Sequence, residues 1–105
     1  MGGFMQPQGH LQVASNMIDY EMDSQEALDA PRFKVEVEGN QDVMVEEDLS
    51  PDVIKELEKR GHTVNIVSGY DRANFGGGQV ISRDLDSGVL TAGSEPRKDG
   101  SAVGY

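Results

Sequence analysis

The chain has 105 residues, the length of one domain, and its 19 acidic against 9 basic residues give a formal charge of −10. A chain this acidic repels nucleic-acid phosphates and anionic membrane surfaces, so we expect no nucleic-acid partner and no membrane partner. The lack of cysteine excludes disulfides, thiolate metal sites and cysteine nucleophiles.

The rest of the composition is typical of a folded protein. The hydrophobic fraction of 36% is low, but the chain also has 13 glycines. Counted together, the apolar residues and glycines reach a share that is usual for globular proteins. The acidic surplus fits either a solvated surface or adaptation to high salt. The chain neither opens with a signal pattern nor contains an apolar run long enough to span a membrane. The compartment of a longer parent protein stays open, because a signal could lie upstream; expressed as it stands, the chain would be expected in the cytoplasm.

Two helices are predicted in the first third of the chain. Apolar residues recur at helical spacing over 8–20. Asp23, followed three residues later by Glu26, is a capping-box pattern that predicts a short helix over 24–29. Pro31 disfavours helical geometry at the preceding residue, and so ends this helix.

A hairpin and a third helix are predicted next. Apolar and charged residues alternate over 33–37, and a second apolar run at 43–45 follows a Gly-Asn turn, which favours an antiparallel hairpin. Ser50 and Pro51 combine a cap with a proline at the first helical position. The helix that they start is expected to end at Gly61.

The last third is predicted to consist mainly of strands. A strand over 62–67 is followed by a polar, glycine-rich loop over 68–78. Two further strands are expected over 79–84 and 88–92, with an irregular tail from residue 93 onward. Helices mixed with antiparallel hairpins favour the α+β fold class over a doubly wound parallel sheet.

The pair Gly2-Gly3, directly before the first helix, is the local pattern that best suits chemistry. Glycine lets a backbone approach a ligand closely, and free N–H groups at a helix start favour negative charge. Such groups can hold the oxyanion of an acyl-transfer intermediate without reorganising. On spacing alone, a flexible end with two small residues is the simpler explanation.

Three motifs in a fixed order are spread across nearly the whole chain. They are MGGFMQPQGHLQVASNMIDYEMDSQEALDAPRF at 1–33, FGGGQVI at 75–81 and GVLTAGSEPRKDGSAVGY at 88–105. With these motifs the chain resembles the C-terminal segment of the gamma-glutamyltransferase family. The signatures of that family include a Gly-Gly pair before a long helix, Asp-Ala-Pro-Arg-Phe, Gly-x-Gly-Gln-x-Ile and Gly-x-Ser-Asp-Pro-Arg. Residues 38–50 and 68–74 match least.

The resemblance implies a fold and a set of partners. Family members are N-terminal-nucleophile hydrolases with a four-layer αββα sandwich, of which residues 1–105 would form a C-terminal part of the small subunit, incomplete on its own. The implied partners are the rest of the parent enzyme, from the small and large subunits, and a small-molecule gamma-glutamyl substrate. No cofactor and no metal are implied. Open strand edges would make self-association a risk.

The resemblance also implies a reaction. In the family a precursor cleaves itself, and the new N-terminal threonine attacks a gamma-glutamyl amide of the glutathione type; the acyl-enzyme is then transferred or hydrolysed. The family's Gly-Gly pair maps onto Gly2 and Gly3, which would be the catalytic oxyanion-hole residues. The nucleophile lies upstream in the family, and Thr63 and Thr91 match nothing catalytic. We therefore expect the isolated chain to be inactive.

Two alternatives stay open beside the main interpretation. The run at 6–10 suits an acylase-like branch, such as a cephalosporin-acylase-like relative, better than the glutathione enzymes. If Met1 is a true start, the chain could instead be a free-standing, non-catalytic binding module derived from the family. The chain also departs from the closing motif of the family, with Glu95 in place of aspartate. The extra methylene changes the reach of this carboxylate, which puts an ion pair there in doubt.

The remaining polar candidates have plainer interpretations. Arg32 and Arg97 are expected to tie the C-terminal segment to its neighbours, and the acidic run 46–48 is expected to be solvated. His10 fits an exposed helix position better than the wall of a pocket. His62 lies far from it in sequence, and without cysteine no metal-ligand spacing is apparent. Gly76-Gly77-Gly78 lacks the lysine and helix of a phosphate loop and is interpreted as a turn.

Overall fold

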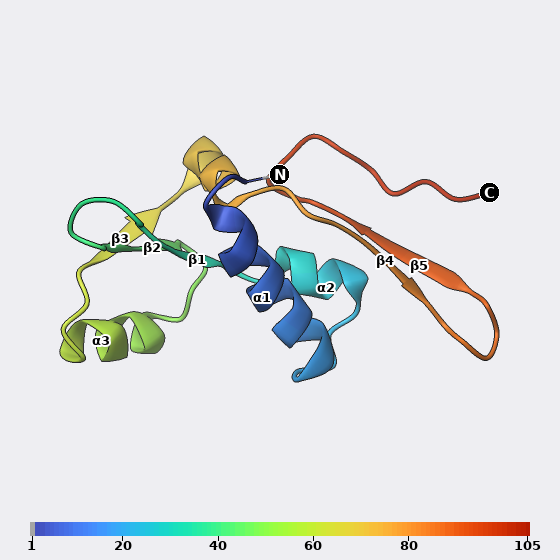
Figure 1. Cartoon of the computed structure of the whole chain (residues 1–105), viewed down its shortest axis with the longest axis horizontal. Helices are drawn as coiled ribbons and strands as arrows, with labels where there is room; N and C mark the ends of the chain where they lie inside the picture. Colours follow the sequence, from blue (N-terminus) through green and yellow to red (C-terminus); the bar gives the residue numbers. More distant parts are fainter. Residues whose placement is uncertain (1) are drawn as a thin grey trace.

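The computed structural model describes residues 2–105 as an elongated molecule of 47 × 26 × 21 Å, with a three-stranded sheet at one end and a two-stranded hairpin at the other (Figure 1). In chain order the elements are α1 Met5–Ile18, α2 Ser24–Asp29, β1 Phe33–Val35, β2 Val43–Glu46, α3 Pro51–Lys59, β3 Val64–Val67, the 3-10 helix η1 Gly69–Phe75, β4 Gln79–Arg83 and β5 Leu90–Ser94. Helix α1 crosses the middle of the molecule beside α2 (Figure 1).

The three-stranded sheet has the order β1-β2-β3. β1 and β2 form the predicted antiparallel hairpin, in which Phe33 lies opposite Val45. β3 lies parallel to β2, with Val43 opposite Val64, because α3 carries the chain back to the same end of the sheet. The sequence predicts the β1–β2 hairpin but does not say how the strand over 62–67 pairs, and its parallel pairing makes this sheet mixed.

The three predicted helix starts have different outcomes. The capping box at α2 is confirmed: the Asp23 side chain accepts hydrogen bonds from the N–H groups of Gln25 and Glu26, and the Glu26 carboxylate accepts one from the N–H of Asp23. Helix α1 begins at residue 5, three residues before the predicted start. α3 does have a proline in its first turn, but the Ser50 side chain makes no capping hydrogen bond, so that part of the prediction was wrong.

The second sheet is the predicted β4-β5 hairpin, in which Gln79 lies opposite Ser94. β5 continues to Ser94, so the prediction of an irregular tail from residue 93 was wrong by two residues. A Cβ atom at Gly93 would lie 2.5 Å from the carbonyl oxygen of Ser24, and β5 can therefore reach the start of α2 only with glycine there. The predicted loop at 68–78 contains the 3-10 helix η1.

The core is small and draws its residues from α1, α2, β2 and η1. It consists of Met5, Ala27, Leu28, Val43, Val45 and Phe75, each at most 5% exposed. Helix α3 contributes no buried residue. In residues 2–105 no helix combines the length and the apolar character needed to cross a membrane.

Candidate functional site

The Gly2-Gly3 pair lies at the entry to α1. The carbonyl groups of both glycines accept hydrogen bonds that begin the helix, from the N–H of Met5 at 2.8 Å and of Gln6 at 3.0 Å. Gly3 has φ +51°, in the left-handed region that favours glycine. Within residues 2–105 no hydrogen bond engages the N–H of either glycine. Two donors are therefore available near the positive end of α1.

Gly2 rests on the loop that joins η1 to β4, formed by residues 76–78. A Cβ atom on Gly2 would lie 3.5 Å from the Cα of Gly76. The side chains of Lys98 and Leu28 pack closely against the rest of this loop. A Cβ on Gly77 would lie 3.2 Å from the Lys98 side chain, and a Cβ on Gly78 would lie 2.8 Å from the Leu28 side chain. The loop leads into a strand, as the sequence predicts, and at Gly78 a side chain would clash with Leu28 unless that residue moved.

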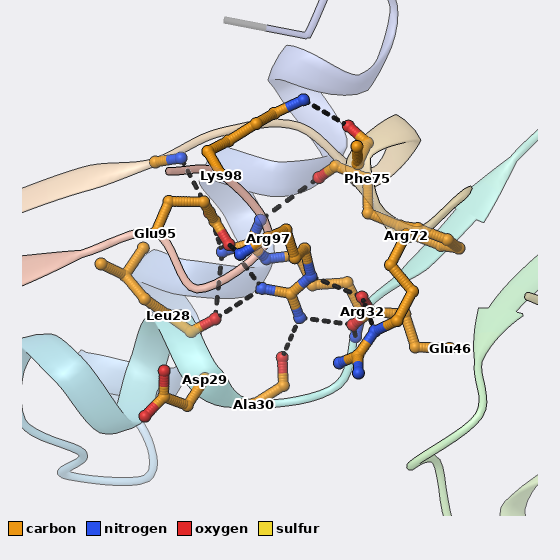
Figure 2. Close-up of polar contacts among 12 residues, drawn as sticks. Leu28, Asp29, Ala30, Arg32, Glu46, Arg72, Phe75, Glu95, Arg97 and Lys98 are labelled. Atoms are coloured by element: carbon orange, nitrogen blue, oxygen red, sulfur yellow. Dashed lines mark hydrogen bonds and ion pairs between the residues drawn. The ribbon is translucent and has the colours of Figure 1, made fainter. Parts of the chain in front are cut away.

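Four buried charged side chains lie behind this loop and form what we call the ion cluster: Arg32, Glu46, Glu95 and Arg97 (Figure 2). Their side chains are at most 4% exposed. Arg97 contacts both oxygens of Glu46 through Nε and Nη2, and its Nη1 lies 2.7 Å from Glu95. Arg32 lies 2.8 Å from the other oxygen of Glu95. Two positive and two negative groups thus neutralise each other out of contact with water.

The ion cluster also binds backbone groups of the α2–β1 connection. Arg97 donates to the carbonyl oxygens of Leu28 and Ala30, at 2.7 and 3.0 Å. The backbone N–H of Arg32 donates to the Glu46 carboxylate at 2.7 Å. The cluster therefore joins the α2–β1 connection, the end of β2 and the C-terminal tail, as Figure 2 shows. This confirms the prediction that Arg32 and Arg97 tie the C-terminal segment to its neighbours.

Hydrogen bonds from the cluster side fix the loop on which Gly2 rests. Arg32 Nη1 donates to the carbonyl oxygen of Phe75 at 3.3 Å, and the N–H of Gly78 donates to Glu95 at 2.8 Å. Just before the loop, Lys98 Nζ donates to the carbonyl oxygen of Ala73 at 2.9 Å. Both ends of the loop are therefore held, and the cluster acts on the Gly2-Gly3 pair through it.

The protonation of the cluster is controlled by its arginines. Burial by itself raises the pKa of Glu46, but hydrogen bonds from Arg97, the Arg32 backbone and Arg72 outweigh it and lower that pKa below its ordinary value. For Glu95, burial is likewise outweighed by hydrogen bonds from the Gly78 backbone and Arg97, so its pKa is also lowered. Burial lowers the pKa of Arg97, but its hydrogen bonds to both carboxylates raise it overall. All of these groups are charged at neutral pH.

Two expectations about the acids need correction. Glu46 was expected to belong to a solvated acidic run, but its side chain has no exposed surface; only the following two acids, at 45% and 62% exposed, are solvated. Arg72 adds a third arginine, with Nε 3.0 Å from Glu46. Glu95 forms ion pairs with both Arg32 and Arg97, so the longer side chain keeps the ion pairing that the substitution for aspartate put in doubt.

The histidines do not meet. His10 is exposed, as predicted, and its Nδ1 lies 2.7 Å from the carbonyl oxygen of Gln6; it also lines the groove between α1 and the 76–78 loop. His62 is exposed beyond the end of α3. In the part of the chain that the structure describes, no three His, Asp or Glu side chains are grouped closely enough to hold a metal ion.

Comparison with known proteins identifies the lineage. The sequence model of the family described as Gamma-glutamyltranspeptidase matches residues 1–105, the whole chain. The chain belongs to the gamma-glutamyltranspeptidase family. The resemblance drawn from the motifs is thereby confirmed.

Individual members of the gamma-glutamyltranspeptidase family show how much of such a protein the chain represents. It is 35% identical to the glutathione hydrolase-like YwrD proenzyme of Bacillus subtilis over 98% of the chain, but over 20% of that protein. It is 26% identical to the oxamate amidohydrolase proenzyme of Klebsiella pneumoniae, again over 20% of that protein. The chain thus spans about a fifth of the length of these relatives.

Solved structures of the family share the fold. The cephalosporin acylase from Bacillus halodurans superposes on all of the chain with a TM-score of 0.90 and 45% identity, over 19% of its own length. The gamma-glutamyltranspeptidase of Helicobacter pylori superposes on 88% of the chain with a TM-score of 0.69 and 27% identity, over 48% of its chain. The mixed α/β arrangement is therefore that of the corresponding part of these enzymes.

Proposed function

We propose that this chain is the C-terminal part of an acyl-transfer enzyme of the gamma-glutamyltranspeptidase family, and that it supplies the oxyanion-hole glycines, Gly2 and Gly3. In that enzyme the segment would complete one end of an αββα sandwich. The reaction is the hydrolysis or transfer of an amide-linked acyl group, of the gamma-glutamyl type, through an acyl-enzyme intermediate.

The observation that carries the proposal is the pair of unengaged N–H groups at the start of α1. A tetrahedral oxyanion needs donors that are already oriented, and backbone N–H groups at a helix start provide them with favourable electrostatics. Gly2 rests on a loop that is held at both ends, through Phe75 and Gly78, so the donors have a rigid support. A flexible end with two small residues would have no need of that support.

We propose that the nucleophile comes from outside these 105 residues. Neither of the two threonines is placed like an activated nucleophile: both are exposed, and Thr91 lies within β5, where its carbonyl accepts hydrogen bonds from Ser24 and Ser82. Without an attacking group, oxyanion donors stabilise nothing, so the isolated chain should release no p-nitroaniline from a gamma-glutamyl anilide.

Within the family, the acylase-like branch is the better candidate for the substrate range. The identity of 45% to the cephalosporin acylase from Bacillus halodurans exceeds the 27% to the gamma-glutamyltranspeptidase of Helicobacter pylori. We therefore propose an amide hydrolase with an acyl donor that need not be glutathione.

A chimera tests the proposal. The part of the Bacillus halodurans acylase that superposes on this chain would be replaced by the chain, and self-cleavage of the precursor and amide hydrolysis would be measured. We expect the chimera to mature and to turn over. Gly3→Ala adds a side chain where φ is +51° and so displaces the donor. Loss of an oxyanion donor lowers kcat by about 10²–10³-fold.

Gly69→Ala is the matched control, because Gly69 also has a left-handed φ, +60°, with no atom near its missing Cβ, as at Gly3. It imposes similar backbone strain away from the start of α1 and should leave kcat within about threefold. An equal loss in both variants would refute the oxyanion role. Turnover by the isolated 105-residue chain would instead favour a complete small enzyme, and failure of the chimera to turn over, despite correct folding, would favour a non-catalytic binding module.

A further inference from the structure

A pocket of about 380 Å³ lies beside Gly2, between the start of α1 and the loop before β4. Its lining includes Lys34 from β1 and Lys98 from the C-terminal tail, and none of the described residues that line it is acidic. The chain has 19 acidic residues but only four lysines, two of which line this one pocket. The local charge is thus opposite to that of the molecule as a whole.

Lys98 is held so that its ammonium group keeps donors to spare. Its stem packs over Gly77, and Nζ donates to the carbonyl oxygen of Ala73 at 2.9 Å. An ammonium group has three N–H donors, so two remain for a ligand. Among the residues that the structure describes, no carboxylate forms an ion pair with Lys98.

Lys34 is the second cation of the pocket. Its Nζ lies 3.1 Å from the carboxylate of Glu36, whose side chain is 41% exposed. A half-exposed ion pair of this kind is weak, and so Lys34 can turn toward a ligand at little cost. Asn74, which also lines the pocket, adds an amide group that can donate.

We propose that this pocket binds a carboxylate group of the reacting small molecule, with Lys98 as the main contact and Lys34 as the second. The inference rests on the function proposed above and deepens it, because a carboxylate held next to Gly2 would select donors or acceptors that carry a free acid. Two ammonium groups and an amide around one cavity suit a compact anion with several acceptor oxygens. In this role Lys98 and Lys34 are specificity-determining residues.

The test is direct binding to the 105-residue chain, followed through its backbone amide resonances. Glutarate is the probe and its neutral diamide is the matched compound. We expect glutarate to shift the amides of Gly2, Asn74 and Lys98, and the diamide to bind at least about tenfold more weakly. Lys98→Met keeps the stem over Gly77 but removes the charge, so it should lower the affinity for glutarate by about tenfold or more. Binding should also weaken as salt is raised.

Two further variants serve as controls. Lys98→Arg keeps the charge and should retain binding within about threefold, while Lys55→Met removes an exposed lysine of α3 and should change nothing. Equal affinity of glutarate for the wild type and Lys98→Met would overturn the proposal. So would equal affinity for glutarate and its diamide, or no glutarate binding up to about 100 mM by a chain with dispersed resonances. Because binding needs no turnover, an inactive chimera with intact glutarate binding would count against the proposed catalytic function and leave the pocket standing.

Discussion

The ion cluster and helix α3 differ in how fully their side chains find partners within the chain. In the cluster, four charged side chains that are at most 4% exposed find all their opposite charges within the chain. Helix α3 has apolar residues on one face, but none of its residues is buried, and Val53 remains 46% exposed. The chain therefore neutralises the buried charges of the cluster internally, whereas it covers the apolar face of α3 only in part. The two regions should respond very differently to substitution.

Removing one charge from the cluster should have the largest effect. Glu46→Gln keeps the shape of the side chain but leaves Arg97 and Arg72 without their carboxylate. Breaking one partner of a buried ion pair costs about 3–5 kcal/mol in the free energy of unfolding. Urea unfolding followed by circular dichroism measures this loss.

The matched control is Glu56→Gln, in the Glu56–Arg60 pair of α3, in which both side chains are about half exposed or more. An exposed pair at this spacing contributes about 0.3–0.5 kcal/mol. If both substitutions cost the same, the contrast between the two regions is wrong.

Acid should weaken the ion cluster. Glu46 and Glu95 both have a pKa below the ordinary value of 4.5 in the folded chain. Their contribution to stability is therefore fully present above pH 4.5 and is lost as the pH falls from there through the lower folded pKa. Glu46→Gln lacks one of these groups, so its free energy of unfolding should fall less steeply in this window. A slope equal to that of the wild type, in urea unfolding at stepped pH, would contradict the assignment.

Truncating an apolar side chain should cost much more stability in the buried core than on α3. Leu28→Ala empties a position in α2 that is 0% exposed, and should cost about 2–5 kcal/mol. Val53→Ala on α3 should change the free energy of unfolding by no more than about 0.5 kcal/mol. A cost above about 1 kcal/mol at Val53, measured by the same urea unfolding, would mean that α3 packs more closely than its exposure indicates.

Local signals in the sequence predicted the parts of the fold that local chemistry controls. The capping box at Asp23 and Glu26 and the two antiparallel hairpins need only neighbouring residues, and all are confirmed. The parallel pairing of β3 with β2 was missed, because a single edge-strand pattern does not say which neighbour it joins.

The candidate site was predictable only in part. The Gly2-Gly3 pair could be proposed from its position before a helix, but the loop that supports it is formed 73 residues later in the chain, at Gly76. Glu46 was missed because a run of three acids is normally solvated, and what buries it is an arginine 51 positions away.

The spacing of the ion cluster has a consequence for the order of events when the chain is made. Arg97 leaves the ribosome 51 residues after Glu46 and 65 after Arg32, and until then Glu46 lacks the arginine that binds both of its oxygens. A carboxylate without its partner resists desolvation, so the nascent chain keeps the end of β2 in water. The ion cluster can therefore form only after Arg97 has been made, so the end of β2 should become buried late relative to its own synthesis.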